Sequence, residues 1–235
     1  MSQTILVTGA NRGIGLALAR ELLAGNHTVI AAARQPEDSR ALQELELKYA
    51  EHFFAVKLDV NSSESVNGAA ELLEEEIDAL DVLVNNAAIF PEDGDESILE
   101  IELQHFRDAF ETNVLGVIRA TRAFLPLLQK AKNPRIVNIS SGAGSISAKD
   151  DNAYIAYSTS KAALNMVTRA MAAEFRKTCV VAITPGWVRT DMGGSNAPLS
   201  PKESARAIAK TITNLTLAQT SKFLERTGAE SSYAW

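Results

Sequence analysis

Short apolar runs alternate with longer segments of helical period along the chain. Seven of these runs are rich in β-branched residues and are short enough to be strands buried on both faces. They are residues 4–8, 27–33, 53–58, 81–85, 135–140, 180–184 and 222–226. Helical segments separate them, and the longest are 100–130 and 152–176. The sequence therefore predicts an α/β protein with a doubly wound, seven-stranded parallel sheet flanked by helices.

The composition is that of one globular domain. The 235 residues are 46% hydrophobic and 22% charged, and we find no linker, low-complexity tract or internal repeat that divides them. A net charge of −6 argues against a nucleic-acid surface, which needs clustered Lys and Arg. The single cysteine, Cys179, excludes an internal disulfide and falls in an apolar run that predicts a buried strand.

The chain shows no signal for a membrane or for secretion. A strand is predicted from Thr4, which leaves no room for a cleavable leader, and no run of about eighteen apolar residues occurs. We therefore expect a cytoplasmic protein with no membrane or nucleic-acid partner.

A glycine-rich turn, TGANRGIG, follows the first predicted strand and precedes an apolar-periodic helix. Gly9, Gly13 and Gly15 permit a tight turn and a close backbone approach to a pyrophosphate, and the helix N-terminus attracts that anion. A glycine turn can also be purely structural. The strand before it and the helix after it are the context that dinucleotide binding requires, so we favour a dinucleotide site.

The end of the second predicted strand indicates which dinucleotide. Ala33 stands where a carboxylate would bind the adenosine ribose, Arg34 follows it, and Arg12 lies within the glycine turn. Arginine suits a 2′-phosphate, so NADP is favoured over NAD, although surface arginines are common. Asp59 suits the adenine amino group. Alternatively, it is a helix cap that lies before Ser62 and Ser63.

Two tyrosines lie in the stretch AYIAYSTSKAAL. On a helix beginning near Asn152, residues four apart share a face, which pairs Tyr157 with Lys161 and Tyr154 with Ser158. A phenol with a pKa of about 10 transfers protons poorly at neutral pH, and a nearby ammonium lowers that pKa. Tyr157 and Lys161 are therefore the candidate acid/base pair. An isolated pair at this spacing is more often a packed tyrosine and a solvated lysine.

The motifs together resemble the short-chain dehydrogenase/reductase family over nearly the whole chain. TGANRGIG, NNAA at 85–88, TNVLG, NISSGAGS, YSTSK and PGWVRTDM match this family in its order. Within the family the chain is most similar to the sniffer and C-factor type of carbonyl reductase, through GSIS, SKAALN, PGWVRTDMGG, APLSP and Trp235. The resemblance implies a single-domain Rossmann fold over 1–235, with about 1–90 mainly binding cofactor and about 100–235 forming the catalytic and substrate half.

The resemblance also implies roles for four residues. Tyr157 would protonate the substrate carbonyl oxygen, and Lys161 would lower the tyrosine pKa and hold the nicotinamide ribose. Ser141, the second serine of ISSG, would steady the substrate oxygen. At the commonest spacing in the family, Ser141 would pair with Tyr154. The position of Lys161, four residues after Tyr157, favours Tyr157 instead. Asn113 would interrupt its helix and anchor a proton-relaying water; otherwise it is a solvent-facing asparagine.

Contacts to NADP(H) follow from the same resemblance. The implied residues are Gly9, Arg12, Gly13, Ile14, Gly15, Arg34, Asp59, Val60, Asn86, Ala87, Tyr157, Lys161, Pro185, Gly186, Val188 and Thr190. One position departs from the family pattern, because Ala88 replaces the usual glycine. We infer that residue 88 does not need a positive φ angle here.

The expected activity is NADPH-dependent reduction of a ketone or aldehyde, without a metal, since the three histidines have no ligand-like spacing. The substrate is expected to be apolar or aromatic. Its walls would be Phe90, Ala143, Ile146, Trp187 and Met192, under a loop near 190–200 with Gly193 and Gly194 as hinges. The alternatives are a non-catalytic NADP-binding signalling or redox-sensing protein and an NAD-dependent alcohol dehydrogenase. Family members often pair through their two longest helices, which implies a homodimer or homotetramer.

Overall fold

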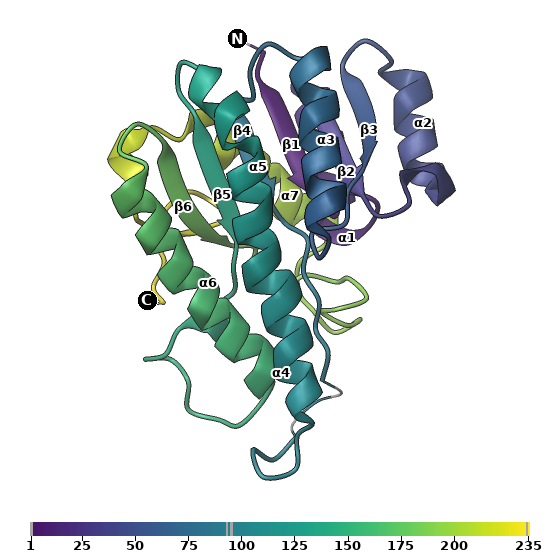
Figure 1. Cartoon of the computed structure of the whole chain (residues 1–235). Coiled ribbons are helices and arrows are strands. Elements are labelled where there is room, and N and C mark those ends of the chain that lie inside the picture. The colour runs from purple at the N-terminus through teal and green to yellow at the C-terminus, as the bar shows by residue number, and fades with distance from the viewer. Residues whose placement is uncertain (1, 93, 95, 234) are drawn as a thin grey trace.

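A seven-stranded parallel sheet forms the centre of the protein (Figure 1). The computed structural model describes residues 2–92, 94, 96–233 and 235. The strands are β1 (Thr4–Thr8), β2 (Thr28–Ala33), β3 (Phe53–Lys57), β4 (Val82–Asn85), β5 (Arg135–Ile139), β6 (Cys179–Thr184) and β7 (Phe223–Glu225). Each predicted strand is present to within one residue at either end, and the order is β3-β2-β1-β4-β5-β6-β7.

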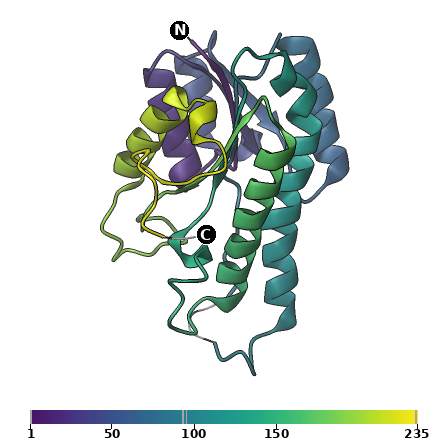
Figure 2. The same ribbon diagram turned by 90° about the vertical axis from the view of Figure 1, so that its left-hand side faces the viewer.

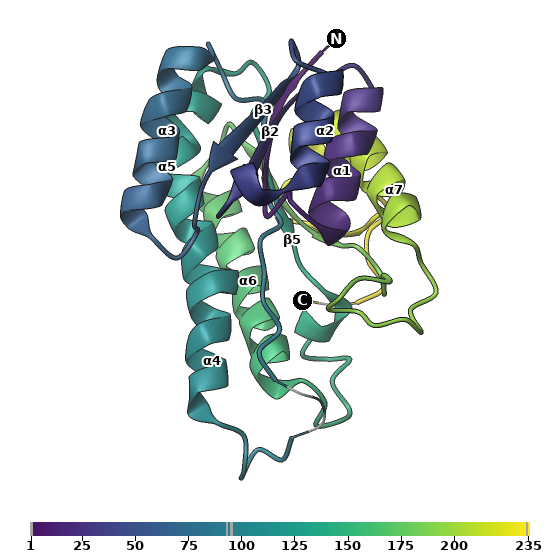
Figure 3. The same ribbon diagram turned by 90° about the vertical axis from the view of Figure 1, so that its right-hand side faces the viewer.

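Helices cover both faces of this sheet (Figure 3). They are α1 (Gly13–Ala24), α2 (Arg40–Lys48), α3 (Ser63–Glu76), α4 (Leu103–Phe110), α5 (Gly116–Lys130), α6 (Ile155–Glu174) and α7 (Pro201–Asn214). Short 3-10 turns, η1 (Pro36–Asp38), η3 (Gly142–Gly144) and η4 (Leu217–Gln219), lie in the connections, and a π-helical segment, η2 (Glu111–Leu115), joins α4 to α5. The arrangement confirms the predicted doubly wound Rossmann-type fold.

The alternation of side chains along each strand divides the core into two layers. Ile5 and Val7 of β1 pack with α1, α2 and α7 on one face, and Leu6 between them packs with α3, α5 and α6 on the other. All three are fully buried. Both faces of a central parallel strand must be covered, which explains why these strands are apolar runs rather than alternating patterns. Cys179 is buried in β6, as predicted.

Two predicted helices differ from the observed ones. The helix predicted over 100–130 is a continuous rod over 103–130, and its middle turn is the π-helix η2, which contains Asn113. The second helix begins at Ile155 rather than near Asn152. Tyr154 adopts a left-handed conformation, with φ 55° and ψ 47°, which an α-helix of L-residues does not accommodate.

The carboxyl ends of the strands meet at one edge of the sheet. From β1 to β3 successive strands are added on one side of β1, and from β4 onward they are added on its other side. Such a switch point in the strand order leaves a crevice for a ligand. Figure 1 shows α4 and the first turns of α6 projecting beyond this edge. Figure 2 shows the C-terminal segment ending beside η3, where Trp235 stacks on Phe223 with ring centroids 5.6 Å apart.

Within the described part of the chain, no helix has the length and apolar character needed to cross a membrane.

Candidate active site

The glycine turn lies at the carboxyl end of β1. Gly9 and Gly13 have φ of 66° and 55°, a region that favours glycine. A Cβ on Gly15 would lie 2.3 Å from the Gly9 carbonyl oxygen, so no side chain fits there. Arg12 precedes α1 without a side-chain capping bond, and no acidic side chain lies in the first turn. The first N–H groups of α1 are therefore available to an anion, which fits a dinucleotide pyrophosphate.

Asn86 and Thr8 hold this turn in place. The Asn86 amide nitrogen donates to the carbonyls of Thr8 and Gly9, at 2.9 and 3.2 Å. The Thr8 hydroxyl accepts from the backbone N–H groups of Asn86 and Ala87, both at 3.0 Å. The turn after β1 and the turn after β4 are thus fastened to each other. Ala88 follows without a positive φ, consistent with its having a side chain.

A single cleft of about 1130 Å³ runs from this turn to α6. Every residue expected to contact the cofactor lines it: Gly9, Arg12, Gly13, Ile14, Gly15, Arg34, Asp59, Val60, Asn86, Ala87, Tyr157, Lys161, Pro185, Gly186, Val188 and Thr190. Ser141 lines it too. The cleft has room for an extended dinucleotide together with a small substrate.

The far end of the cleft carries the residues expected near the adenosine. Arg34 is exposed and forms no salt bridge with the described residues. Arg12 is ion-paired with Asp191 at 3.0 Å, an exposed pair that contributes at most about 1 kcal/mol and is easily exchanged for a phosphate. Asp59 does not cap α3, because Ser62 does, and its carboxylate instead accepts from the Asn61 N–H at 3.0 Å.

The two candidate serines point in different directions. The Ser140 hydroxyl donates to the Asn165 side chain at 2.6 Å within the core. Ser141 lines the cleft and hydrogen bonds to the Tyr157 side chain, a contact that lowers the pKa of Tyr157. The structure therefore brings Ser141, and not Ser140, to the tyrosine.

Lys161 is 2% exposed, one helical turn after Tyr157. Its ammonium donates to the Ile139 carbonyl at 2.9 Å and lies 5.6 Å from the centre of the Tyr157 ring. Burial disfavours the charged form and lowers the pKa of Lys161 to about 8. At neutral pH the side chain is still mainly an ammonium.

The pKa of Tyr157 differs from what the sequence indicated. Burial raises this pKa to about 12; the hydrogen bond from Ser141 opposes that rise, and the Glu92 carboxylate adds to it. The expectation that Lys161 lowers this pKa is wrong for the protein chain, because desolvation raises it and Lys161 is not among the groups that shift it. Tyr157 is therefore a neutral phenol, a proton donor, throughout the physiological pH range.

Glu92 is a site residue that the sequence did not reveal. It is 2% exposed, and its carboxylate accepts from the Tyr157 backbone N–H at 2.8 Å. Tyr154 supplies no side-chain cap to α6, so Glu92 caps this helix from a distant segment. Its other oxygen, Oε2, is buried without a hydrogen-bond partner among the described residues. No local sequence pattern around residue 92 predicts its contact with Tyr157.

Asn113 is fully buried in the π-helix, so the solvent-facing alternative is wrong. Its carboxamide accepts from the Ile89 N–H at 2.9 Å and donates to the Ile89 carbonyl at 3.0 Å. It also donates to the Ser160 hydroxyl at 3.0 Å. Asn113 does interrupt regular helix bonding, and it links η2 to α6 and to the segment after β4. A water held by Asn113 stays a prediction.

Four of the five expected apolar walls line the cleft: Phe90, Ala143, Trp187 and Met192. Ile146 does not, and its side chain is 74% exposed. The lining also includes Tyr154 and Tyr233, which were not expected there. The Phe90 ring packs against both tyrosines, and its centroid lies 4.9 Å from that of Tyr154 and 5.1 Å from that of Tyr157.

The segment after Thr190 is a closed loop. The Thr190 hydroxyl accepts from the Gly193 N–H at 3.1 Å, and the Gly194 N–H donates to the Thr190 carbonyl at 2.9 Å. A Cβ on Gly193 would lie 2.0 Å from the Val188 carbonyl oxygen. Gly193 is thus required by close packing, and a hinge role for it stays a prediction.

Among the described residues, no group of three or more His, Cys, Asp or Glu side chains is placed to hold a metal ion.

Comparisons with known proteins agree with this geometry. Residues 3–199 match the family model described as short chain dehydrogenase. The NADPH-dependent pterin aldehyde reductase of Arabidopsis thaliana is 37% identical over 223 residues, which cover 92% of this chain and 89% of that protein. The carbonyl reductase Sniffer of D. melanogaster superposes with a TM-score of 0.94 at 32% identity, over 100% of both chains. An NADPH-bound carbonyl reductase from chicken fatty liver gives a TM-score of 0.89 at 33% identity, over 100% of this chain and 99% of that one.

The chain belongs to the short-chain dehydrogenase/reductase family, as the sequence motifs predicted.

The contact between Glu92 and Tyr157 generates a prediction. Glu92→Gln keeps an oxygen to accept the Tyr157 N–H and removes the negative charge that disfavours tyrosinate, so the pKa of Tyr157 should fall. NMR titration of ¹³C-labelled tyrosine side chains measures it, with the Tyr157 signal assigned through Tyr157→Phe. Glu100→Gln, an exposed change in the same connection, should leave this pKa unaltered. An unchanged or higher pKa in Glu92→Gln would contradict the electrostatic role.

Proposed function

We propose that this protein reduces a ketone or aldehyde to the alcohol, with NADPH as the hydride donor. It is a short-chain dehydrogenase/reductase, and its relatives include NADPH-dependent reductases and carbonyl reductases. The observation that carries the proposal is the Tyr157 hydroxyl, which meets Ser141 in the same cleft that the glycine turn opens.

The cleft fits NADP(H). Its glycine turn has no room for side chains, and the exposed N–H groups of α1 suit the pyrophosphate. Arg34, which has no ion-pair partner among the described residues, suits the 2′-phosphate, and Arg12 lines the same cleft. When bound, NADPH supplies hydride to the carbonyl carbon. Lys161 and Asn86 would hold the nicotinamide half, and Gly186 and Val188 would border it.

Tyr157 would then donate its hydroxyl proton to the carbonyl oxygen as negative charge develops there. A pKa of about 12 keeps the proton on Tyr157 at neutral pH, which suits the reductive direction. Ser141 would orient the same carbonyl oxygen by hydrogen bonding. The Lys161 ammonium, 5.6 Å from the ring centre, would stabilise the tyrosinate that forms. Asn113 would act by holding the segment after β4 against α6.

The two alternatives are less well supported. A protein that only binds NADP needs the glycine turn and Arg34 but has no use for Tyr157, Lys161 and Ser141 in one cleft. An NAD-dependent dehydrogenase would be expected to carry a carboxylate at position 33 or 34.

The substrate is proposed to be apolar or aromatic, because Phe90, Trp187 and Met192 line the cleft and Phe90 packs against Tyr157. The loop near 190–200 would cover it. We propose that residues of about 1–90 mainly bind the cofactor and that residues of about 100–235 form the catalytic and substrate-binding half. A cytoplasmic location stays a prediction.

Tyr157→Phe removes only the hydroxyl. We expect kcat for carbonyl reduction to fall by about 10²–10⁴-fold, the usual contribution of a positioned general acid, while NADPH still binds. NADPH consumption with a panel of ketones and aldehydes, together with a direct binding measurement, tests this. Tyr49→Phe, remote from the cleft, is the matched control. Full activity in Tyr157→Phe would refute the assigned role, and tight NADPH binding without turnover in any variant would favour the binding-protein alternative.

Arg34→Asp tests the cofactor preference. Charge-assisted hydrogen bonds contribute about 1.5–3 kcal/mol, so kcat/KM for NADPH should fall about tenfold or more while that for NADH is maintained or rises. The control is Arg40→Asp, which makes the same charge change on an exposed side chain outside the cleft. A wild type that prefers NADH, with no response to Arg34→Asp, would contradict the NADP assignment.

We also propose a homodimer or homotetramer assembled through α4, α5 and α6. Leu103 on α4 and Met166 on α6 are 66% and 69% exposed, so both apolar side chains are accessible to a second chain that packs on these helices. Analytical ultracentrifugation should give the mass of two or four chains, and Met166→Glu should shift the protein toward monomer. Leu47→Glu, on exposed α2, should not. A wild type that sediments only as a monomer would contradict this assembly.

A further inference from the structure

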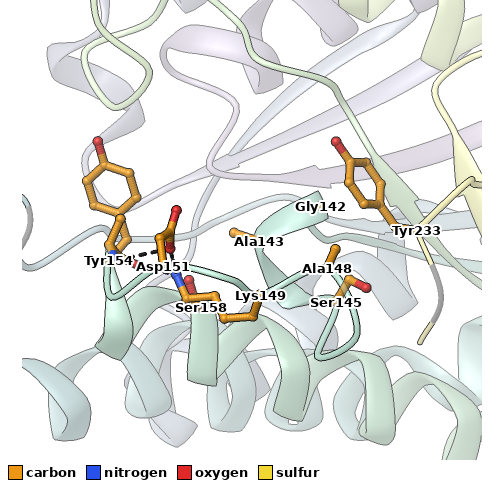
Figure 4. Close-up of a pocket in the computed structure, with 10 residues that line it drawn as sticks. Gly142, Ala143, Ser145, Ala148, Lys149, Asp151, Tyr154, Ser158 and Tyr233 are labelled. Carbon is orange, nitrogen blue, oxygen red and sulfur yellow. Dashed lines mark hydrogen bonds and ion pairs between the residues drawn. The ribbon is translucent and has the colours of Figure 1, made fainter.

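Tyr154 and Ser158, the other tyrosine and its partner four residues later, also lie beside a cavity. Tyr157 and Lys161 face the large cleft, whereas Tyr154 and Ser158 border a smaller pocket of about 240 Å³ (Figure 4). The pocket is enclosed by η3, by the connection from η3 to α6 and by the C-terminal segment. Its lining is Gly142, Ala143, Ser145, Ala148, Lys149, Asp151, Ala153, Tyr154, Ser158 and Tyr233.

The small pocket adjoins the catalytic cleft. Gly142, Ala143, Tyr154 and Tyr233 line both cavities. The Tyr233 ring lies directly over Gly142, where an added Cβ would be 2.7 Å from ring carbons. A substrate whose carbonyl lies at Tyr157 could therefore extend past the Tyr154 ring into the pocket.

Ser158 supplies an unused hydrogen-bonding group there. It is 7% exposed, and its hydroxyl has no partner among the described residues. The next two hydroxyls of α6 are both satisfied: Thr159 donates to the Ile155 carbonyl and Ser160 to the Tyr157 carbonyl, each at 2.7 Å. Buried polar side chains nearly always have a partner, so the Ser158 hydroxyl has an unused hydrogen bond to offer to a ligand group, once a small rotation of the side chain turns it into the pocket.

The charges around the pocket select against an ionic ligand. The Lys149 ammonium is bonded to the Asp151 carboxylate at 2.7 Å and also donates to the Ala153 carbonyl. Figure 4 shows Lys149, Asp151, Ser158 and Tyr154 on one side of the pocket, and Tyr233 across from them. Lys149 and Asp151 already neutralise each other, so a carboxylate or an ammonium would lose its hydration here without gaining a free counter-ion. An uncharged oxygen group avoids this penalty and can bond to Ser158.

The aromatic wall between the cavities is firmly placed. Tyr154 takes its left-handed conformation immediately before α6, a costly arrangement for a residue with a side chain, and its ring packs edge-on against Phe90. Phe90 in turn contacts Tyr157. The wall thus connects the small pocket to the reacting end of the cleft and favours a planar spacer between them.

We propose that this pocket is a distal substrate subsite that takes an uncharged hydroxyl or carbonyl group, joined to the reacting carbonyl through an aromatic spacer. This proposal rests on the carbonyl reductase activity proposed above and specifies its substrate class. Ser158 is a specificity-determining residue in it, not a catalytic one.

Three matched probes test the subsite: 4-(hydroxymethyl)benzaldehyde, 4-ethylbenzaldehyde and 4-carboxybenzaldehyde. The first two have nearly the same shape and differ in one hydroxyl, and the third adds a negative charge. Wild type should have the highest kcat/KM for the hydroxymethyl probe. Ser158→Ala should lower its preference over the ethyl probe by about fivefold, the effect of one neutral hydrogen bond. The rate with the ethyl probe and the affinity for NADPH should not change.

The matched control is Thr159→Ala, because Thr159 is adjacent and exposed and its hydroxyl is bonded within the helix. It should leave the preference unaltered. Ser158→Leu, which extends an apolar side chain toward the pocket, should abolish the preference and keep NADPH binding, with thermal melting as the check on folding. An equal preference in wild type and Ser158→Ala, or a wild-type preference for the carboxylate probe, would overturn the subsite.

A binding measurement separates this proposal from the proposed activity. The alcohols 1,4-benzenedimethanol and 4-ethylbenzyl alcohol are titrated onto the protein saturated with NADPH, a complex in which no hydride transfer can occur, and binding is followed by ligand-observed NMR. Tighter binding of the diol that disappears in Ser158→Ala supports the subsite even if no aldehyde is reduced. Equal binding of the two alcohols by wild type overturns the subsite even if all three aldehydes are reduced.

Discussion

The Asn113 carboxamide holds the active site together. It bonds to both backbone groups of Ile89 and to the Ser160 hydroxyl, so one buried side chain links the segment after β4 to η2 and α6. The residues that follow Ile89 depend on this link: Phe90 packs on Tyr157, and Glu92 accepts from the Tyr157 N–H. The π-helical turn is the local consequence, because it gives the amide a position inside the protein that a regular α-helical turn would not.

Desolvation sets the protonation states at the reacting end of the cleft. Burial raises the pKa of Tyr157 to about 12 and lowers that of Lys161 to about 8. These opposite shifts have one cause, since a buried site favours the neutral form of an acid and of a base alike. The result is a protonated phenol beside a readily titrated ammonium. The phenol keeps its proton until negative charge develops on the substrate oxygen, and it is still a stronger acid than the alcohol that forms.

The two turns of α6 nearest the active site serve two cavities. Tyr157 and Lys161 line the dinucleotide cleft, Ser158 lines the smaller pocket, and Tyr154, immediately before the helix, lines both. The distance between proton donor and subsite is therefore fixed by one rigid element. Sites built on helices position side chains more precisely than sites built on loops, which suits a specificity contact close to the reacting carbonyl.

The sequence by itself determined the seven strands, the glycine turn and the choice of Tyr157 over Tyr154. Each of these depends on local rules: apolar runs for buried parallel strands, positive φ for glycine, and a four-residue phase on a helix. The tertiary structure alone decided the parts that join distant segments. Glu92 caps a helix 65 residues further on, Tyr233 lies over Gly142, and Arg12 pairs with Asp191. It also decided the high pKa of Tyr157, because desolvation depends on everything packed around the phenol, whereas the lysine one turn away is visible in the sequence.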